Sequence, residues 1–377
     1  MAIRTLNDLQ DKTACPLLVV KLGSALLVDG GGQIRQDWLD GLIETLAGLH
    51  QAGQRIVLVS SGAIALGAAR LRLPVGGRGS LSDAQAAASV GQIALAGLWS
   101  EGFARHDIVT AQMLLTLDDL EDRRRYLNAS ATLGRLLDAG AVPVINENDS
   151  VATEEIRFGD NDRLAARVAQ AAGAQAVLLL SDVDGLFDRH PDEDGASLLS
   201  VVDTIDSSIR TMASDGSGSG LGSGGMVSKI QAAEMATRAG VALAIANGTA
   251  DHPIKRVFNE GIGTLFLAQE PNSARKGWLG GRLAPAGSLR VDKGCAQALR
   301  DGASLLAAGI IGVSGAFQRG DLVTICDMGG RKLAQGLSEY AVDECLAIAG
   351  KRAADQADIL GYSPRATVIH RDHMVML

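Results

Sequence analysis

The stretch Pro16-Leu-Leu-Val-Val-Lys21-Leu-Gly-Ser24 joins an unbroken apolar run to a lysine, a glycine and a serine. A run in which apolar and polar residues do not alternate is typical of a strand buried on both faces, as in a parallel sheet. Similar runs recur along the chain at residues 56–59, 142–145, 176–180, 241–246 and 264–267. The sequence therefore predicts a mainly parallel sheet that spans the first two thirds of the chain.

Segments with helical character separate these runs. Residues 83–103 are rich in alanine and follow a candidate N-cap at Ser82, and residues 118–139 end before Gly140, a residue type that commonly terminates helices. Because strands and helices alternate, we predict a three-layer α/β/α sandwich. The predicted limits of this domain are residues 15–268.

The pattern changes after a glycine- and proline-bearing stretch at residues 277–287. Short β-like pieces follow at residues 288–291, 322–326, 332–337 and 367–370, with helices near Ala296 and Asp343. This alternation predicts a small, mostly-β domain. We expect it to cover residues 285–373, joined to the first domain by a linker at 269–284.

The composition favours small-molecule chemistry. The 377 residues are 47% hydrophobic and carry a net charge of −8, so a globular chain without a generally basic surface is expected. Aromatic residues make up only 3%, which disfavours a stacking groove for single-stranded nucleic acid. No window approaches the ~20 apolar residues of a membrane helix. The four cysteines form no CxxC pair, and a reducing cytoplasmic location fits them best.

Polar side chains follow several of the predicted strands. Lys21 and Ser24, Ser61, residues 146–149, and Ser181 with Asp182 all stand at such ends. Ligands of open parallel sheets bind at the carboxyl ends of the strands, so we expect these side chains to converge on one site. The alternative for any single position is an ordinary polar turn.

The glycine- and serine-rich run at residues 215–229 is a candidate phosphate site. A helix-like segment follows it at once, so free backbone N–H groups and Lys229 would face an anion. The alternative is a flexible linker. Residues 220–225 satisfy GxGxxG, but no buried strand precedes them, and no GxxxxGK[ST] occurs, so a Rossmann or P-loop site is disfavoured.

An acidic stretch, Gly159-Asp-Asn161-Asp162, lies earlier in the chain, shortly after the strand-end residues 146–149. It fits a helix N-cap, and its carboxylates would also orient lysines, bind an ammonium group or approach Mg²⁺. His370 and His373 form an HxxH pair without further ligands, which we interpret as surface.

These motifs together resemble the amino acid kinase family, in particular its glutamate-phosphorylating branch, and the C-terminal part resembles a PUA domain. The match covers nearly the whole chain. The segments that carry it are 20–24, 59–67, 143–149, 158–162, 180–182 and 222–229, followed in the C-terminal part by 292–296, 304–310, 317–321 and 334–338.

The resemblance implies ATP-dependent phosphorylation of the L-glutamate side-chain carboxylate to L-glutamyl 5-phosphate, the first step of proline synthesis. It implies Mg²⁺ with the nucleotide, proline as a feedback inhibitor and a homo-oligomer. Lys21 and Lys229 would flank the phosphoryl group, Asp162 would hold the lysines, and Ser61, Asp149 and Asn161 would bind glutamate. The implied ATP-binding residues are Lys21, Ser181, Asp182, Ser223, Gly224, Gly225, Met226, Val227, Ser228 and Lys229. No residue is assigned as a metal ligand.

Two alternatives stay open from the sequence. One is another carboxylate or amino acid kinase of the same family. The other is an RNA-binding protein that acts through its PUA domain, but residues 285–377 hold ten basic and ten acidic side chains, a neutral balance that disfavours nucleic acid.

Overall fold

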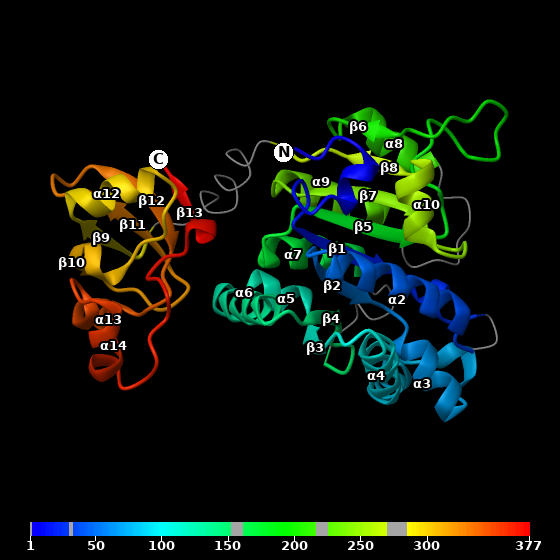
Figure 1. Ribbon diagram of the computed structural model, residues 1–377, viewed down its shortest axis with the longest axis horizontal. Helices are drawn as coiled ribbons and strands as arrows, with labels where there is room; N and C mark the ends of the chain where they lie inside the picture. The colour runs from blue at the N-terminus through cyan, green and yellow to red at the C-terminus, as the bar shows by residue number, and fades with distance from the viewer. Residues whose placement is uncertain (1, 30–32, 152–160, 216–224, 270–284) are drawn as a thin grey trace. The chain divides into compact units, whose positions relative to one another are not determined.

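The computed structural model describes residues 2–29, 33–151, 161–215, 225–269 and 285–377 (Figure 1). The chain divides into two compact units, and each is described here by itself. The first unit comprises Met1–Glu121 and Ala129–Gln269, and the second comprises Asp122–Asn128 and Glu270–Leu377. Among the described residues, no helix is both long enough and apolar enough to cross a bilayer.

The first unit is built on one eight-stranded sheet with the order β3-β4-β2-β1-β5-β7-β8-β6. All neighbours run parallel except β7 and β8, which are antiparallel. The predicted α/β fold with a mainly parallel sheet is therefore confirmed. The strands are β1 (Leu17–Leu22), β2 (Arg55–Ser60), β3 (Thr110–Leu115), β4 (Val142–Glu147), β5 (Ala176–Ser181), β6 (Val201–Val202), β7 (Ala242–Asn247) and β8 (Thr264–Phe266).

Helices cover both faces of this sheet. Alternate residues of β1, such as Leu18 and Val20, belong to a core cluster that includes side chains of α2, α4 and α10, while α7 and α9 pack on each other and on β1 and β7. The helices up to residue 260 are α1 (Ser24–Leu27), α2 (Gln36–Gln51), α3 (Ala63–Leu71), α4 (Leu81–Ala104), α5 (Leu117–Glu121), α6 (Arg123–Asp138), α7 (Asn161–Ala172), α8 (Ser207–Asp215), α9 (Met226–Arg238) and α10 (Pro253–Glu260), with 3-10 turns η1 (Leu6–Gln10) and η2 (Pro74–Gly77).

The second unit holds a five-stranded sheet with the order β10-β9-β11-β12-β13 around its own apolar core. This confirms the predicted small β-rich domain. Its elements are β9 (Gly287–Val291), α12 (Lys293–Arg300), η4 (Ala307–Gly309), β10 (Ile310–Gly315), β11 (Leu322–Cys326), β12 (Lys332–Leu337), α13 (Val342–Ile348), α14 (Ala353–Leu360), η5 (Arg371–His373) and β13 (Met374–Met376).

The structure corrects several local predictions in the first unit. Strands β3 and β6 were not predicted, because β3 is only partly buried and β6 is two residues long. The N-cap of α4 is Ser80 instead of Ser82, since the Ser80 hydroxyl accepts a hydrogen bond from the Asp83 backbone N–H at 3.0 Å. The helix predicted at residues 118–139 is two helices, α5 and α6.

Corrections in the second unit concern its last residues. Residues 367–370 form no strand; Ile369 makes an isolated bridge with Leu305. Strands β10 and β13 and helix α14 were not predicted. His373 is buried, with 6% of its surface exposed, so its interpretation as a surface residue is wrong.

Helices α3 and α4 cross with their backbones in direct contact. A Cβ on Gly67 would lie 1.7 Å from the Ala87 carbonyl oxygen, and a Cβ on Gly91 would lie 1.7 Å from the Ala63 carbonyl oxygen. No side chain fits at either distance. The two glycines therefore permit the close crossing that holds α3 beside α4.

We expect Gly67→Ala to lower the free energy of unfolding by about 3 kcal/mol or more, because the added methyl group forces two packed helices apart. Gly97→Ala is the matched control. Gly97 also lies in α4, a Cβ there meets nothing within 4 Å, and alanine should stabilise the helix by up to ~1 kcal/mol. Urea unfolding of both variants measures the difference, and equal stabilities would contradict the proposed role of the crossing.

Candidate active site

Two lysines converge on one buried carboxylate at the carboxyl edge of the sheet. Lys21 Nζ lies 2.5 Å from Asp162 Oδ1, and Lys229 Nζ lies 3.1 Å from Asp162 Oδ2. Lys21 is on the central strand β1, Asp162 is in the first turn of α7, and Lys229 is in the first turn of α9. Three segments far apart in the sequence thus meet at one point, as the strand-end pattern predicts for Lys21.

The Asp162 carboxyl is ionised despite its burial. Only 1% of its side chain is exposed, and burial by itself raises the pKa of a carboxyl group. The charges of Lys21 and Lys229 and their hydrogen bonds outweigh this effect and lower the pKa of Asp162 below its ordinary value. The cluster therefore holds two positive charges against one negative charge, an excess that suits an anionic ligand.

A chain of amide hydrogen bonds lies next to this cluster. Asn161 Nδ2 donates to Ser61 Oγ at 2.6 Å and to Asn146 Oδ1 at 3.2 Å. Asn146 Nδ2 in turn donates to Gln92 Oε1 at 2.8 Å. The structure thus brings the predicted residues Ser61 and Asn161 into direct contact, and the network orients the Asn161 amide.

The same network leaves one acceptor unused. Asn161 Oδ1 is buried and accepts no hydrogen bond from the described residues. A buried acceptor without a donor costs free energy, so a ligand that donates a hydrogen bond would bind well there. An ammonium group is such a donor.

Asp149 follows β4 by two residues and is half-buried. Burial raises the pKa of its carboxyl to about 6, although the positive charge of Arg78 acts in the opposite direction. No hydrogen bond joins Asp149 to Ser61 or Asn161 in the described part of the chain. Its predicted place beside them stays a prediction.

The predicted nucleotide residues fall into two groups. Ser181 ends β5, next to β1, and its hydroxyl donates to Asp182 Oδ1 at 3.0 Å. Gly225 is the N-cap of the thirteen-residue helix α9, and Ser228 Oγ near its start is buried without a partner among the described residues. Ser223 and Gly224, with most of the predicted glycine-rich loop, lie outside the described residues.

These groups suit a triphosphate chemically. The positive end of α9, the Ser228 hydroxyl and Lys229 supply donors and charge for phosphate oxygens. No group of three or more His, Cys, Asp or Glu side chains that could hold a metal occurs in the described ranges. A Mg²⁺ ion that arrives bound to phosphate oxygens needs only one or two protein carboxylates, so this donor set fits it as well.

Gln92 is the member of the network that sequence reasoning missed. It lies in α4, which also carries Gln85, Ser89 and other polar side chains, so its residue type alone does not distinguish it in the sequence. Asn146 belongs to the strand-end group 146–149 that was predicted to converge on the site, but no role was assigned to it, and Arg78 was not predicted at all. They reach the site through hydrogen bonding and charge, respectively.

We expect Gln92→Ala to raise the KM for the predicted glutamate substrate about tenfold with little change in kcat, since the Asn146 amide loses its acceptor and Asn161 its orientation. Gln92→Glu keeps an acceptor oxygen and should restore most of the affinity. Glu101→Ala, at an exposed position of the same helix, is the control. Steady-state kinetics of the three variants measure the effect, and an unchanged KM in Gln92→Ala would contradict the proposed orientation of Asn161.

Comparison with known proteins shows the family of the chain. Residues 16–247 match the model of the amino acid kinase family, and residues 287–360 match the model of the PUA domain. A glutamate 5-kinase of Novosphingobium aromaticivorans is 59% identical over 377 residues, which is 100% of both chains. A glutamate 5-kinase of Sphingopyxis alaskensis is 57% identical over 364 residues, 97% of this chain and 98% of the relative.

Among solved structures, a UMP kinase from Bacillus anthracis superposes with a TM-score of 0.45 and 14% sequence identity, covering 68% of this chain and 97% of that one. A likeness of this degree carries no weight in the assignment, which rests on the family model and the relatives. The chain belongs to the amino acid kinase family and, within it, to the glutamate 5-kinases.

Proposed function

We propose that this protein transfers the γ-phosphoryl group of ATP to the side-chain carboxylate of L-glutamate, which yields L-glutamyl 5-phosphate and ADP in the first step of proline biosynthesis. The observation that carries the proposal is the pair of lysines on Asp162, directly beside the Asn161 amide. Cations that suit phosphoryl transfer and polar groups that suit an amino acid thus lie side by side.

The chemistry of the acceptor makes a general base unnecessary. A carboxylate is already ionised at pH 7, so its oxygen attacks phosphorus without losing a proton. Two anions must instead be brought together, and phosphoryl transfer is promoted mainly by positioning and by nearby cations. We assign this role to Lys21 and Lys229, with Asp162 as the residue that positions both.

The substrate side is assigned by its hydrogen-bonding capacity. The free Asn161 Oδ1 and the Asp149 carboxylate would accept from the α-ammonium group of glutamate, and the Ser61 hydroxyl would bind a carboxylate. An acetylated amine carries no charge and one N–H. It would leave the Asp149 carboxylate without a cation.

The nucleotide side is assigned to Ser181, Asp182 and residues 223–229, with Lys21. Mg²⁺ would neutralise the triphosphate and travel with it. Proline, which lacks the second carboxylate of glutamate, would inhibit by overlapping the Asp149 and Asn161 positions. The loop at residues 150–159, proposed to respond to it, lies largely outside the described residues.

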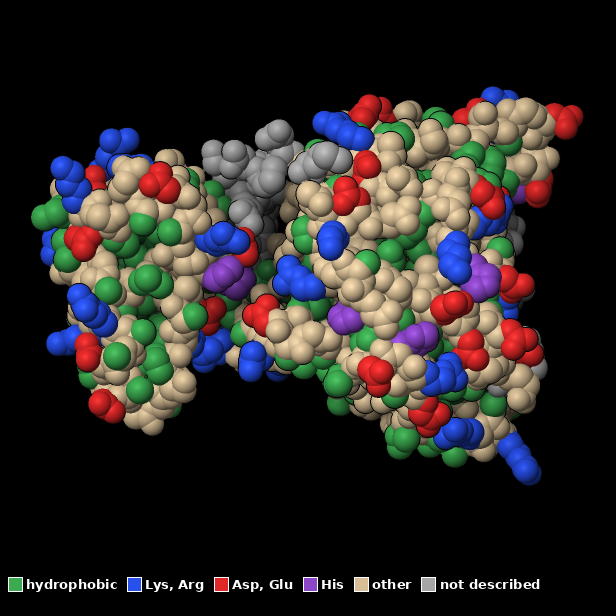
Figure 2. Space-filling model, in the orientation of Figure 1, with side chains coloured by type: hydrophobic (Ala, Val, Ile, Leu, Met, Phe, Trp, Pro, Cys, Tyr) green, Lys and Arg blue, Asp and Glu red, His purple; other side chains and the backbone are tan. Residues whose placement is uncertain are grey.

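We also propose a cytoplasmic homo-oligomer. The four cysteines are free thiols, which suits a reducing compartment. An RNA-binding function of the whole protein is not favoured, since Figure 2 shows basic and acidic side chains interspersed on the visible faces, without a continuous basic surface.

The function is tested by incubating the purified protein with ATP, Mg²⁺ and either glutamate or N-acetylglutamate, with hydroxylamine to trap the acyl phosphate. We expect hydroxamate from glutamate only. Lys229→Met should lose about 10²-fold or more in kcat, because it removes a cation that acts in the transition state. Hydroxamate from acetylglutamate alone, or a fully active Lys229→Met protein, would overturn the assignment.

The raised pKa of Asp149 predicts the pH dependence of glutamate binding. The ionised carboxylate attracts the substrate ammonium, and protonation below pH 6 removes this attraction. The KM for glutamate should therefore rise about fourfold between pH 7.5 and 5.5, a range in which neither the ammonium nor the carboxylates of glutamate titrate appreciably. Initial rates at saturating ATP measure this rise.

Asp149→Asn is the matched variant for this measurement. It cannot ionise, so its KM should be high and independent of pH over the same range. It should be at least as stable as the natural chain, because burial disfavours the carboxylate charge that it removes. A KM of the natural chain that does not change with pH would contradict the role of Asp149.

A further inference from the structure

The second unit contains a basic cavity that the kinase reaction does not use. Its volume is about 300 Å³, and it is lined by residues from α12, from the start of β12 and from the end of β13. The lining residues are Arg300, Arg331, Lys332, Leu333, Met376 and Leu377. Three of these side chains are cationic and none is acidic.

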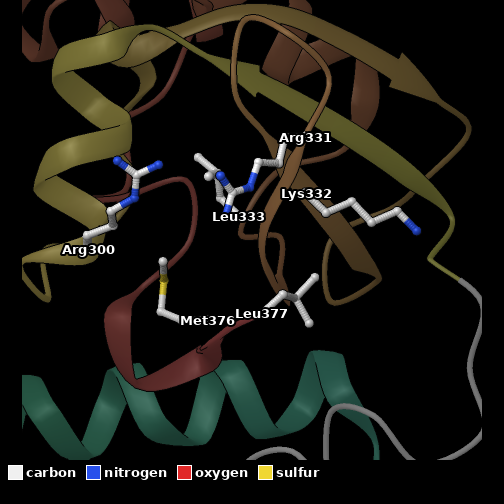
Figure 3. A pocket seen from close by; sticks show the side chains of 6 residues that line it. All are labelled: Arg300, Arg331, Lys332, Leu333, Met376 and Leu377. Atoms are coloured by element: carbon white, nitrogen blue, oxygen red, sulfur yellow. The ribbon is translucent and has the colours of Figure 1, made fainter.

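Two guanidinium groups face the same space in this cavity. Figure 3 shows that the Arg300 side chain extends from α12 and the Arg331 side chain from the start of β12 toward each other, whereas the Lys332 ammonium points away from both. Neither arginine forms an ion pair within the described ranges. Both residues are exposed, so solvent weakens their mutual repulsion, and an anion between them would interact favourably with both guanidinium groups.

A purely structural role explains only one of the two arginines. Arg300 lies in the last turn of α12, where a positive charge is favourable because of the helix dipole. Arg331 has no such reason to face the cavity. Its backbone N–H donates to the Asp327 carboxylate at 2.9 Å, a contact that does not involve the guanidinium group.

We propose that this cavity binds a small, multiply charged phosphate anion of the pyrophosphate or nucleotide class. Guanidinium groups bind phosphate oxygens in bidentate pairs, and two such groups match a charge of −2 better than they match a single carboxylate. No aromatic side chain lines the cavity, so it offers no aromatic ring on which an unpaired nucleic-acid base could stack. The apolar side chains of Leu333 and Met376 complete the wall.

The test is calorimetric titration of the full-length protein with sodium pyrophosphate. We expect Lys21 and Lys229 to give every variant a first pyrophosphate site, and the natural chain to show a second site in the cavity. The comparison is with the double variant Arg300→Gln/Arg331→Gln. In the double variant, affinity at the second site should fall by about tenfold or more. Glutamate-dependent ATP turnover should be unchanged, because neither arginine belongs to the kinase site.

Two further variants sharpen the result. Arg300→Lys/Arg331→Lys keeps the charge but not the forked donors, and it should bind with intermediate affinity. Arg352→Gln removes an exposed arginine outside the cavity and should bind as the natural chain does. Equal stoichiometry and affinity in all four proteins would overturn the proposal. An RNA hairpin that binds more tightly than pyrophosphate, and is lost in the double Gln variant, would overturn it in favour of nucleic acid.

Discussion

Two buried lysines cannot occupy one small volume unless a carboxylate lies between them, and Asp162 meets this requirement. Asp162 lies in the first turn of α7, so this helix must begin next to Lys21 of β1 and Lys229 of α9. Asn161, the preceding residue, is then placed against Ser61. The start of a single helix therefore determines the charge of one half of the site and the hydrogen bonding of the other half.

The sheet supplies the rest of this geometry. Because β1 lies between β2 and β5, Lys21 has the Ser61 segment on one side and the Ser181 segment on the other. The close crossing of α3 and α4 holds Gln92 within reach of Asn146, so the acceptor that orients the amide network comes from a helix outside the sheet. Asn161 Oδ1 and Ser228 Oγ are buried at this edge without a hydrogen-bond partner among the described residues, and we propose that the substrates use them.

The sequence predicts those parts of the fold that depend on burial alone. Strands β1, β4 and β5 are buried at every residue, and each appears in the sequence as an apolar run of four or five residues that is followed by a polar residue. Edge strand β3 has an exposed Gln112 and several partly buried residues, so its sequence lacks the continuous apolar run that identifies the buried strands. The choice of Ser80 over Ser82 as an N-cap depends on a hydrogen bond, which composition does not reveal.

The candidate site likewise has parts that the sequence predicts and parts that it does not. Lysines, carboxylates and amides at strand ends can be found by their residue type, and the resemblance to a family assigns roles to them. The function of Gln92 depends on which way α4 is rotated, and the contact of Gly67 with Ala87 depends on how two helices cross. Both are tertiary properties without a local pattern. The facing guanidinium groups of Arg300 and Arg331, 31 positions apart, are also a tertiary property of this kind.

The strand order has a consequence for synthesis on the ribosome. Strand β1 emerges first, yet its neighbour β5 and the partner of Lys21 follow more than a hundred residues later. Burying a lysine before its counter-ion exists is costly, so the early chain cannot close around β1. Until β5 is synthesised, β1 can pair with β2 on one side only. Its unpaired, apolar edge is the kind of surface that chaperones bind.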